Sequence, residues 1–311
     1  MSIVSLGAHI VDVLAQHVDA WPDGQDTAVV DRIRMTPAGS AAGTAVGLAV
    51  LGREVRSLGA IGTDELGDFL LASMAAKGVD VREVVRRTDV QTSASMLPIR
   101  SNGERAAVHV AGANLTFGAG DVPEGALESA RAVHVGGPDV CLGLPQEDFA
   151  QRLRRVRATG TLVTMDLLSG VPDLLRAATV LLPCVDYLLP NEEQILRMTG
   201  RTDVLEAARD LLALGANGVV VTLGAAGSLV VTAEEAVRIL AIDVPVVDTT
   251  GCGDAYCAAF LIGLLDGSDP VGAARLGTAA AATVAGGLGS NAALTDLDSL
   301  RALTERIPHD Q

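Results

Sequence analysis

Short apolar runs that alternate with longer helix-like segments constrain the fold of this chain more than any other feature. Runs such as SIVSL, AVHVGG, LVTMD and GVVVTLG each lie close to a segment of helical character that is rich in alanine, leucine, arginine and glutamate. Continuous apolar runs are typical of parallel strands buried on both faces, with crossover helices between them. The pattern predicts an α/β protein in which helices flank a doubly wound, mostly parallel central sheet.

Two more polar stretches interrupt this alternation, at about residues 13–36 and 88–112. They alternate in polarity and carry turn signals at Pro22-Asp23-Gly24 and Asn102-Gly103, as β-hairpins do. We expect both stretches to form a small β-sheet lid over one edge of the large sheet, within a single domain of residues 1–311. Lids of this kind exclude water from a reaction.

Charge and composition exclude several classes of protein. The net charge of -15, without any block of lysine or arginine, disfavours binding to nucleic acid or to anionic membranes. No basic leader or spanning apolar run is evident, so we expect a cytoplasmic protein. The four cysteines lack the spacing of a zinc site and the density of a disulfide scaffold, and we expect reduced thiols.

The stretch VPVVDTTGCGDAYCAAFLIGLL carries the strongest chemical signal. We expect a strand at Val244–Asp248 and an apolar helix just after Asp254, which places the intervening loop at the carboxyl edge of the sheet, where α/β folds bind ligands. Gly251 and Gly253 allow backbone amides to converge on one point next to a helix N-terminus, which favours an anion. Asp254 would then take a proton from a group that attacks the anion. The alternative is that Asp254 is only a helix N-cap and the glycines only make a turn.

Several segments resemble, in order, motifs of the ribokinase-like (PfkB) carbohydrate kinases. DTTGCGD is similar to the D-T-x-G-A-G-D signature of the family, and PAGSAAGTAVGLAVLG to its glycine-rich segment. GAHIVD resembles the substrate loop after the first strand, SNGERA the lid hairpin, VDYLLPNEEQILRMTG the N-x-x-E helix, and VVVTLGAAGSLV the nucleotide-binding T-L-G-x-x-G. The resemblance covers about residues 3–290 and implies the same fold with a β-lid.

The resemblance also implies transfer of the γ-phosphate of ATP, with Mg²⁺, to a sugar or nucleoside hydroxyl. Asp254 would be the catalytic base, and the amides of Gly251, Cys252 and Gly253 would hold the charge that develops on the transferred group. Asp12 would bind substrate hydroxyls, and Gly39 would let the backbone approach the substrate closely. The alternatives are an Asx turn that closes the strand at Asp12 and helix-entry packing at Gly39.

The resemblance implies a second group of residues around the nucleotide. Thr222, Gly224 and Gly227 would line ATP, although a plain strand-turn-strand would explain them equally well. Asn191 and Glu192 would position water around Mg²⁺, which takes few direct protein ligands; capping of the next helix by Asn191 is the alternative. Asp248 and the carbonyl group of Thr250 would help to bind a monovalent cation such as K⁺.

The chain departs from the family pattern at several positions. Gly43 stands where the family has a substrate-binding asparagine, and Gln194 replaces the glutamate of N-x-x-E, which puts metal affinity in doubt. In MDLLSG, Leu168 and Gly170 replace the asparagine and arginine of some relatives, which disfavours a 2-keto-3-deoxygluconate kinase or fructokinase. Arg34, Arg100 and Arg105 could serve a phosphosugar, but such residues are more often solvated residues of a lid. Cys252 replaces alanine and is either a reactive thiol or simply a small residue that fits.

The sequence therefore predicts an ATP-dependent sugar kinase. The alternatives are a nucleoside kinase of the same fold and a non-catalytic sugar- or nucleotide-binding relative. No Walker-type loop, dinucleotide fingerprint or hydrolase motif is present in the sequence. Because β edges in a lid often pair with another lid, a homodimer through the lid is plausible.

Overall fold

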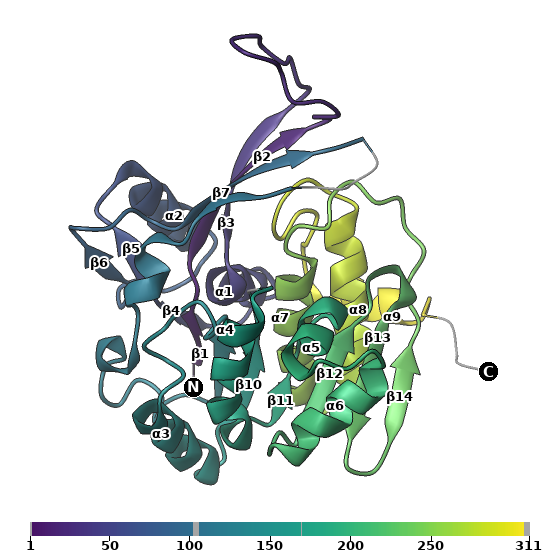
Figure 1. Cartoon of the computed structure of the whole chain (residues 1–311). Coiled ribbons are helices and arrows are strands. Elements are labelled where there is room, and N and C mark those ends of the chain that lie inside the picture. The colour runs from purple at the N-terminus through teal and green to yellow at the C-terminus, as the bar shows by residue number, and fades with distance from the viewer. Residues whose placement is uncertain (1, 102–105, 169, 308–311) are drawn as a thin grey trace.

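A large, mostly parallel sheet forms the centre of the computed structural model, which describes residues 2–101, 106–168 and 170–307 (Figure 1). Neighbouring strands from β4 to β12 run parallel, and β13 and β14 continue the sheet in antiparallel order. The strands, in order across the sheet, are β4 (Val55–Leu58), β1 (Ile3–Gly7), β9 (Ala132–Gly136), β10 (Leu162–Asp166), β11 (Tyr187–Leu188), β12 (Gly218–Thr222), β13 (Ser228–Thr232) and β14 (Ala236–Ile239). The predicted α/β class with a mostly parallel sheet is confirmed.

Helices cover both faces of this sheet (Figure 1). One face carries α3 (Glu147–Ala158), α4 (Pro172–Ala177), α5 (Glu192–Thr199) and α6 (Val204–Ala213), and the other carries α1 (Ser40–Val50), α2 (Glu65–Ala76), α7 (Cys252–Leu265), α8 (Pro270–Ala285) and α9 (Leu297–Thr304). Short 3-10 helices are η1 (Gly112–Thr116), η2 (Ala119–Asp121), η3 (Ala178–Cys184) and η4 (Gly224–Ala226). Within the described part of the chain, no helix combines the length and apolarity required to cross a bilayer.

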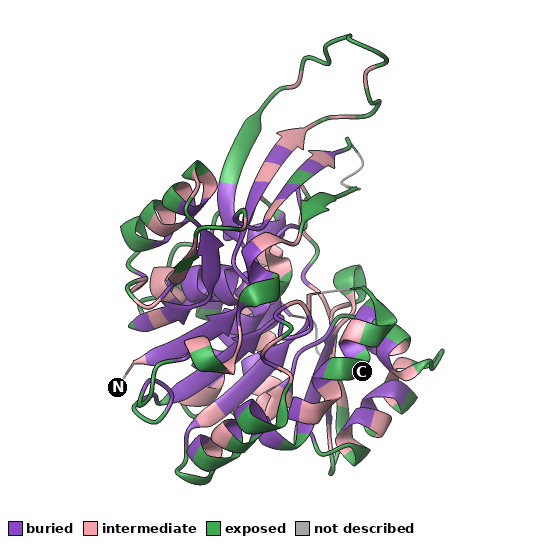
Figure 2. Ribbon diagram, turned by 60° about the vertical axis from the view of Figure 1, so that its left-hand side comes forward, coloured by how far each residue is buried: buried purple, intermediate pink, exposed green. Residues whose placement is uncertain are grey.

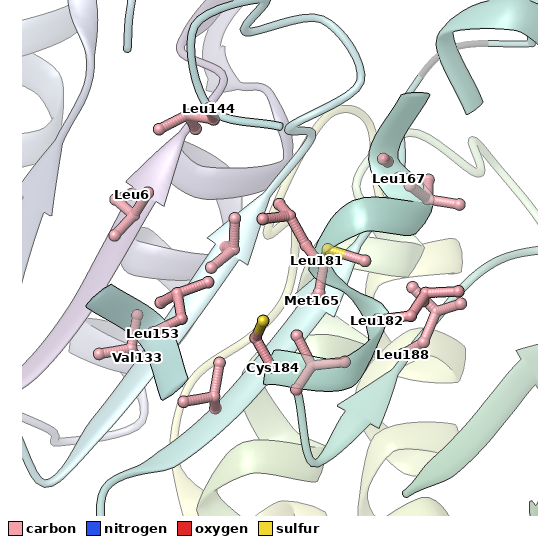
Figure 3. Close-up of a cluster of buried hydrophobic side chains, with 14 of the residues drawn as sticks. Leu6, Val133, Leu144, Leu153, Met165, Leu167, Leu181, Leu182, Cys184 and Leu188 are labelled. Atoms are coloured by element: carbon pink, nitrogen blue, oxygen red, sulfur yellow. The ribbon is translucent and has the colours of Figure 1, made fainter. Parts of the chain in front are cut away.

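The strands are apolar on consecutive residues because both of their faces are buried. Along β12, Val219 and Val221 join the cluster under α3 to α6, whereas Val220 joins a cluster with residues of α7 and α8. Figure 3 shows the first cluster, where leucines of η3 and methionine and valine side chains of the strands fill the space. Aliphatic side chains thus build the core of a chain that is 2% aromatic.

A second, four-stranded sheet projects from the edge of the large one (Figures 1 and 2). Its strands, in order, are β3 (Ile33–Ala38), β2 (Ile10–Gln16), β7 (Ala94–Ile99) and β8 (Val108–Val110). We call this sheet the lid. It begins at Ile10, earlier than the stretch expected from residue 13. The turn expected at Pro22-Asp23-Gly24 is present, with the amide of Asp26 donating to the carbonyl oxygen of Asp23. A small separate pair consists of β5 (Ala60–Gly62) and β6 (Val85–Arg87).

The two faces of the lid differ in polarity, because side chains alternate along each strand. One register row places Asp12 beside Ser95, which is paired with His109. The adjacent row belongs to the opposite face and consists of Met35, Val13, Met96 and Val108. The row that includes Asp12 faces the cavity described below, and the methionine and valine row faces outward.

Candidate active site

The loop before α7 adopts a different structure from the one that its apolar residues predict. Residues 244–248 form no strand, so the expected strand Val244–Asp248 is wrong. Pro245 has no amide to donate to a neighbouring strand. The amides of Val247 and Asp248 instead donate to the carbonyl oxygen of Ala285, at the end of α8, over 2.8 and 3.3 Å. The segment thus crosses from the sheet to the helix layer.

The turn at Gly251 forms the N-terminus of α7, and its geometry suits an anion. Gly251 is the N-cap with φ 78°, and a Cβ atom there would lie 2.6 Å from the Cα atom of Ser290. A glycine is therefore required both by conformation and by space. Among the described residues, nothing accepts a hydrogen bond from the amide of Gly251 or of Gly253. These amides and the helix dipole favour an anion at this point.

Asp254 lies inside the first turn of α7, which begins at Cys252, three residues earlier than expected. The alternative that Asp254 is the N-cap is therefore wrong. Its carboxylate lies against Gly43 of α1, where a Cβ atom would be 2.0 Å from Asp254 Oδ2. The asparagine found here in the family would displace this carboxylate. Gly43 therefore provides the space that Asp254 occupies.

Asp248 connects the loops on either side of this turn. It is completely buried, and its Oδ1 accepts hydrogen bonds from the amide and the hydroxyl group of Thr250 over 3.0 and 2.8 Å. Its Oδ2 accepts from the amide of Gly289 over 2.8 Å. Ser290 Oγ, beside Gly251, is buried without a hydrogen-bond partner among the described residues. These contacts fix the backbone that carries the anion-binding amides.

One cavity, of about 540 Å³, lies between this loop and the lid, and we call it the acceptor cavity. It contains Asp254, Gly251 and Gly253 from the α7 turn and Asp12 from the lid. Asp12 lies within β2, so the Asx-turn alternative at a strand end is wrong. Gly39 also lines this cavity; its φ of 88° and the 2.7 Å from a Cβ position to the carbonyl oxygen of Ala8 require glycine. Gly39 thus both packs closely at the start of α1 and lines the cavity.

A second cavity, of about 590 Å³, lies on the other side of the α7 turn, and we call it the nucleotide cavity. Thr222, Gly224 and Gly227 line it, together with Cys252 and small residues of α8. Thr222, Thr249 and Gly253 belong to both cavities. The two cavities therefore meet at the anion-binding turn.

The expected magnesium residues are only partly brought together. Asn191 caps α5: its Oδ1 accepts from the amide of Gln194, and Gln194 Oε1 accepts from the amide of Asn191, both over 2.9 Å. The capping alternative is thus correct, although Asn191 also lines the acceptor cavity. Gln194 Nε2 donates to the carbonyl oxygen of Leu167 over 2.9 Å, a bond that glutamate could not make. Glu192 is exposed and lines neither cavity.

A buried group of titratable side chains forms one wall of the acceptor cavity. Asp166, at the end of β10, lies 3.6 Å from His134 Nε2 and 3.9 Å from Cys257 Sγ. Burial, followed by the nearby charge of Asp254, raises the pKa of Asp166 well above its ordinary value. Burial lowers the pKa of His134 to about 3, so this imidazole is neutral near pH 7.

The sequence did not single out three residues that line the acceptor cavity, namely Ser95, His109 and Ser290. Ser95 Oγ lies 3.1 Å from His109 Nδ1, and partial burial lowers the pKa of His109 from 6.5. The alternation of polar and apolar residues in SASML and VHV, on strands that pair near Asp12, could have indicated Ser95 and His109. Arg105, one of the basic lid residues, lies outside the described residues, as does the Asn102-Gly103 turn.

The chain belongs to the pfkB family of carbohydrate kinases, whose profile matches residues 1–297. A nucleoside kinase from Methanothermobacter thermautotrophicus is 27% identical over 86% of this chain and 84% of its own. An ATP-dependent 6-phosphofructokinase from Thermoanaerobacterium thermosaccharolyticum is 25% identical over 97% of this chain and 93% of its own. The structure of Arabidopsis thaliana ribokinase with ribose and ATP has a TM-score of 0.81 at 24% identity, covering 98% of each chain. The expected family and fold are confirmed, and the chain is a phosphotransferase by class.

Proposed function

We propose that this protein transfers the γ-phosphate of MgATP to a hydroxyl group of a monosaccharide, with a nucleoside as the alternative acceptor. One observation carries the proposal: the two cavities meet at the anion-binding turn, and of the two only the acceptor cavity is lined by Asp254. This arrangement suits a phosphoryl group that passes between two molecules in line. The relatives named as a nucleoside kinase and a phosphofructokinase support a hydroxyl acceptor but differ in its kind.

In this mechanism the side chains position the acceptor and move one proton. Asp12 accepts hydrogen bonds from acceptor hydroxyl groups, and the carboxylate of Asp254 takes the proton of the hydroxyl that attacks the γ-phosphorus. The amides of Gly251 and Gly253 donate to the oxygens of the transferred group. The absence of an acceptor for these amides in the described structure fits a phosphate at this point. Mg²⁺ bound with the nucleotide would offset phosphate charge, and Asn191, which lines the acceptor cavity, would position its water ligands.

We also propose that a monovalent cation such as K⁺ binds beside Asp248 and the carbonyl oxygen of Thr250. The buried carboxylate of Asp248 and Ser290 Oγ, for which the described residues offer no hydrogen-bond partner, provide the oxygen ligands that such a cation requires. Activity should then be higher in potassium than in tetramethylammonium buffer of equal ionic strength. Equal activity in the two buffers would refute the cation site.

A second copy of this chain is the partner that fits the outer face of the lid. Met35, Met96 and Val108 are 39%, 47% and 59% exposed and lie in one register row, in which the half-buried Val13 separates Met35 from Met96. An apolar row on the solvent side of a sheet with free edges favours association between lids. Analytical ultracentrifugation should show a dimer that Met96→Asp converts to monomer, whereas Leu214→Asp, at another exposed leucine, should not. A monomeric parent protein would refute the proposal.

ADP release in the presence of MgATP tests the kinase function. The acceptor panel should contain pentoses, hexoses, their phosphates and nucleosides, with Asp254→Asn measured in parallel. Turnover on one class, abolished by Asp254→Asn, would support the proposal and identify the acceptor. Binding of a sugar or nucleoside without turnover would favour the non-catalytic alternative.

A further inference from the structure

The acceptor cavity has an unusual distribution of charge. The carboxylates of Asp12 and Asp254 line it, together with the buried carboxyl group of Asp166, whose pKa is raised, and no lysine or arginine does so among the residues that the structure describes. Asp12 is 7% exposed, so solvent screens its charge only weakly. An anionic group brought into this cavity beside Asp12, away from the amides of the α7 turn, would lose its hydration and meet like charges instead of a counter-ion.

Within the described part of the chain, two basic groups near the cavity, His109 and Arg34, do not offset this charge. His109 lies in the same lid row as Ser95, and the lowered pKa of its imidazole keeps it neutral near pH 7. Arg34 projects from the same face of the lid, but its Nη1 donates to the carbonyl oxygen of Leu288 over 2.5 Å. That bond holds the guanidinium at the loop following α8.

Neutral hydroxyl groups suit the same surface well. Each hydroxyl can donate one hydrogen bond to a carboxylate, and Ser95 Oγ and the His109 imidazole can accept or donate further ones. Asp12 and Ser95 are register partners on adjacent strands, so vicinal hydroxyl groups can reach both at once.

We propose that the acceptor is an uncharged polyol, either a free sugar or a nucleoside, and that the cavity rejects acceptors bearing a phosphate or carboxylate group. This inference rests on the kinase function proposed above. An uncharged acceptor would distinguish this chain from relatives such as the phosphofructokinase, whose name specifies a phosphorylated acceptor.

Matched pairs of compounds test the proposal directly. Binding of fructose and fructose 6-phosphate, of glucose and gluconate, and of inosine and its 5′-phosphate should be measured by calorimetry in the presence of a non-hydrolysable ATP analogue. For the pair whose neutral member binds, we expect the anion to bind at least about 100-fold more weakly. An anion that binds as tightly as its neutral partner would overturn the inference.

Three variants test whether the cavity causes the selectivity. Asp12→Asn should narrow the ratio between neutral and anionic ligands about tenfold, whereas Asp298→Asn, at a carboxylate 94% exposed on α9, should leave it unchanged. Arg34→Gln should also leave the ratio unchanged; loss of anion binding in this variant would show that Arg34 serves a charged acceptor and refute the inference. Since these are binding measurements, an absence of ADP release would count against the kinase function alone.

Discussion

The two cavities on either side of the α7 turn are lined by residues of different chemical character. The nucleotide cavity is lined mostly by apolar and small residues, among them Gly224, Gly227 and Ala282, and Asp243 is its one charged residue among those described. The acceptor cavity has a similar volume but contains three carboxyl groups. A mostly apolar wall selects mainly by shape, whereas a wall with carboxyl groups selects by charge and by hydrogen bonding. The comparison suggests that nucleotide and acceptor binding respond to different substitutions.

The largest expected effect is at Asp254, where the two cavities meet. Asp254→Asn keeps the shape but cannot take a proton, so we expect kcat to fall about 10²–10⁴-fold while the Kd of ATP changes little. Asp243→Asn, in the nucleotide cavity, is the matched control and should retain kcat. Steady-state ADP release and calorimetric ATP binding measure both quantities. Loss of activity in both variants to the same extent would remove the distinction between the cavities.

The next effect concerns stability and arises from the buried carboxyl group of Asp166. Its pKa is raised in the folded state, so its contribution to stability is fully present below the unfolded pKa of about 3.8 and is lost as pH rises toward the folded pKa. Asp166→Asn does not titrate and should become more stable than the parent as pH rises, by about 1.4 kcal/mol per pH unit within that window. Urea denaturation at several pH values measures this difference. If the difference in free energy of unfolding between parent and variant stays constant with pH, the pKa of Asp166 is not raised in the folded state.

Sequence reasoning succeeded where residues act through local chain geometry. The glycine pattern around Gly251 and the apolar α7 predict a glycine turn followed by a helix, because positive φ and a helix start are properties of consecutive residues. The alternation of apolar runs likewise predicts the parallel sheet. Such features require no knowledge of distant contacts.

Residues that depend on packing between distant segments were harder to predict. Val244–Asp248 has the composition of a strand but donates its amides to the end of α8, a partner that the sequence does not indicate. Ser95 enters the acceptor cavity because β7 pairs with β2 at Asp12, across a sequence separation of more than 80 residues. The glycine at position 43, where the family has asparagine, is explained only by the position of Asp254. Tertiary contacts decide all three.

A smaller effect should follow from filling the nucleotide cavity. Ala282 lines it from α8, and Ala282→Leu adds a branched side chain where the nucleotide would lie. We expect the KM of ATP to rise about tenfold, corresponding to about 1.4 kcal/mol, with the acceptor KM unchanged. Ala282→Ser, which adds little volume, is the control. An equal rise in both KM values would show that the two cavities act as one unit.

The smallest expected effect is a change in the labelling rate of Cys252. This residue is partly exposed at the wall of the nucleotide cavity, whereas Cys141, Cys184 and Cys257 are buried. A thiol at a helix N-terminus is favoured as thiolate by the positive end of the dipole, so a thiol reagent should modify Cys252 first. ATP should slow this reaction several-fold because it covers the thiol, while a bound acceptor should not. Mass spectrometry of peptides labelled with and without each ligand measures the rates, with Cys252→Ala identifying the site. Equal rates with and without ATP would place the nucleotide elsewhere, and protection by the acceptor alone would reverse the roles of the two cavities.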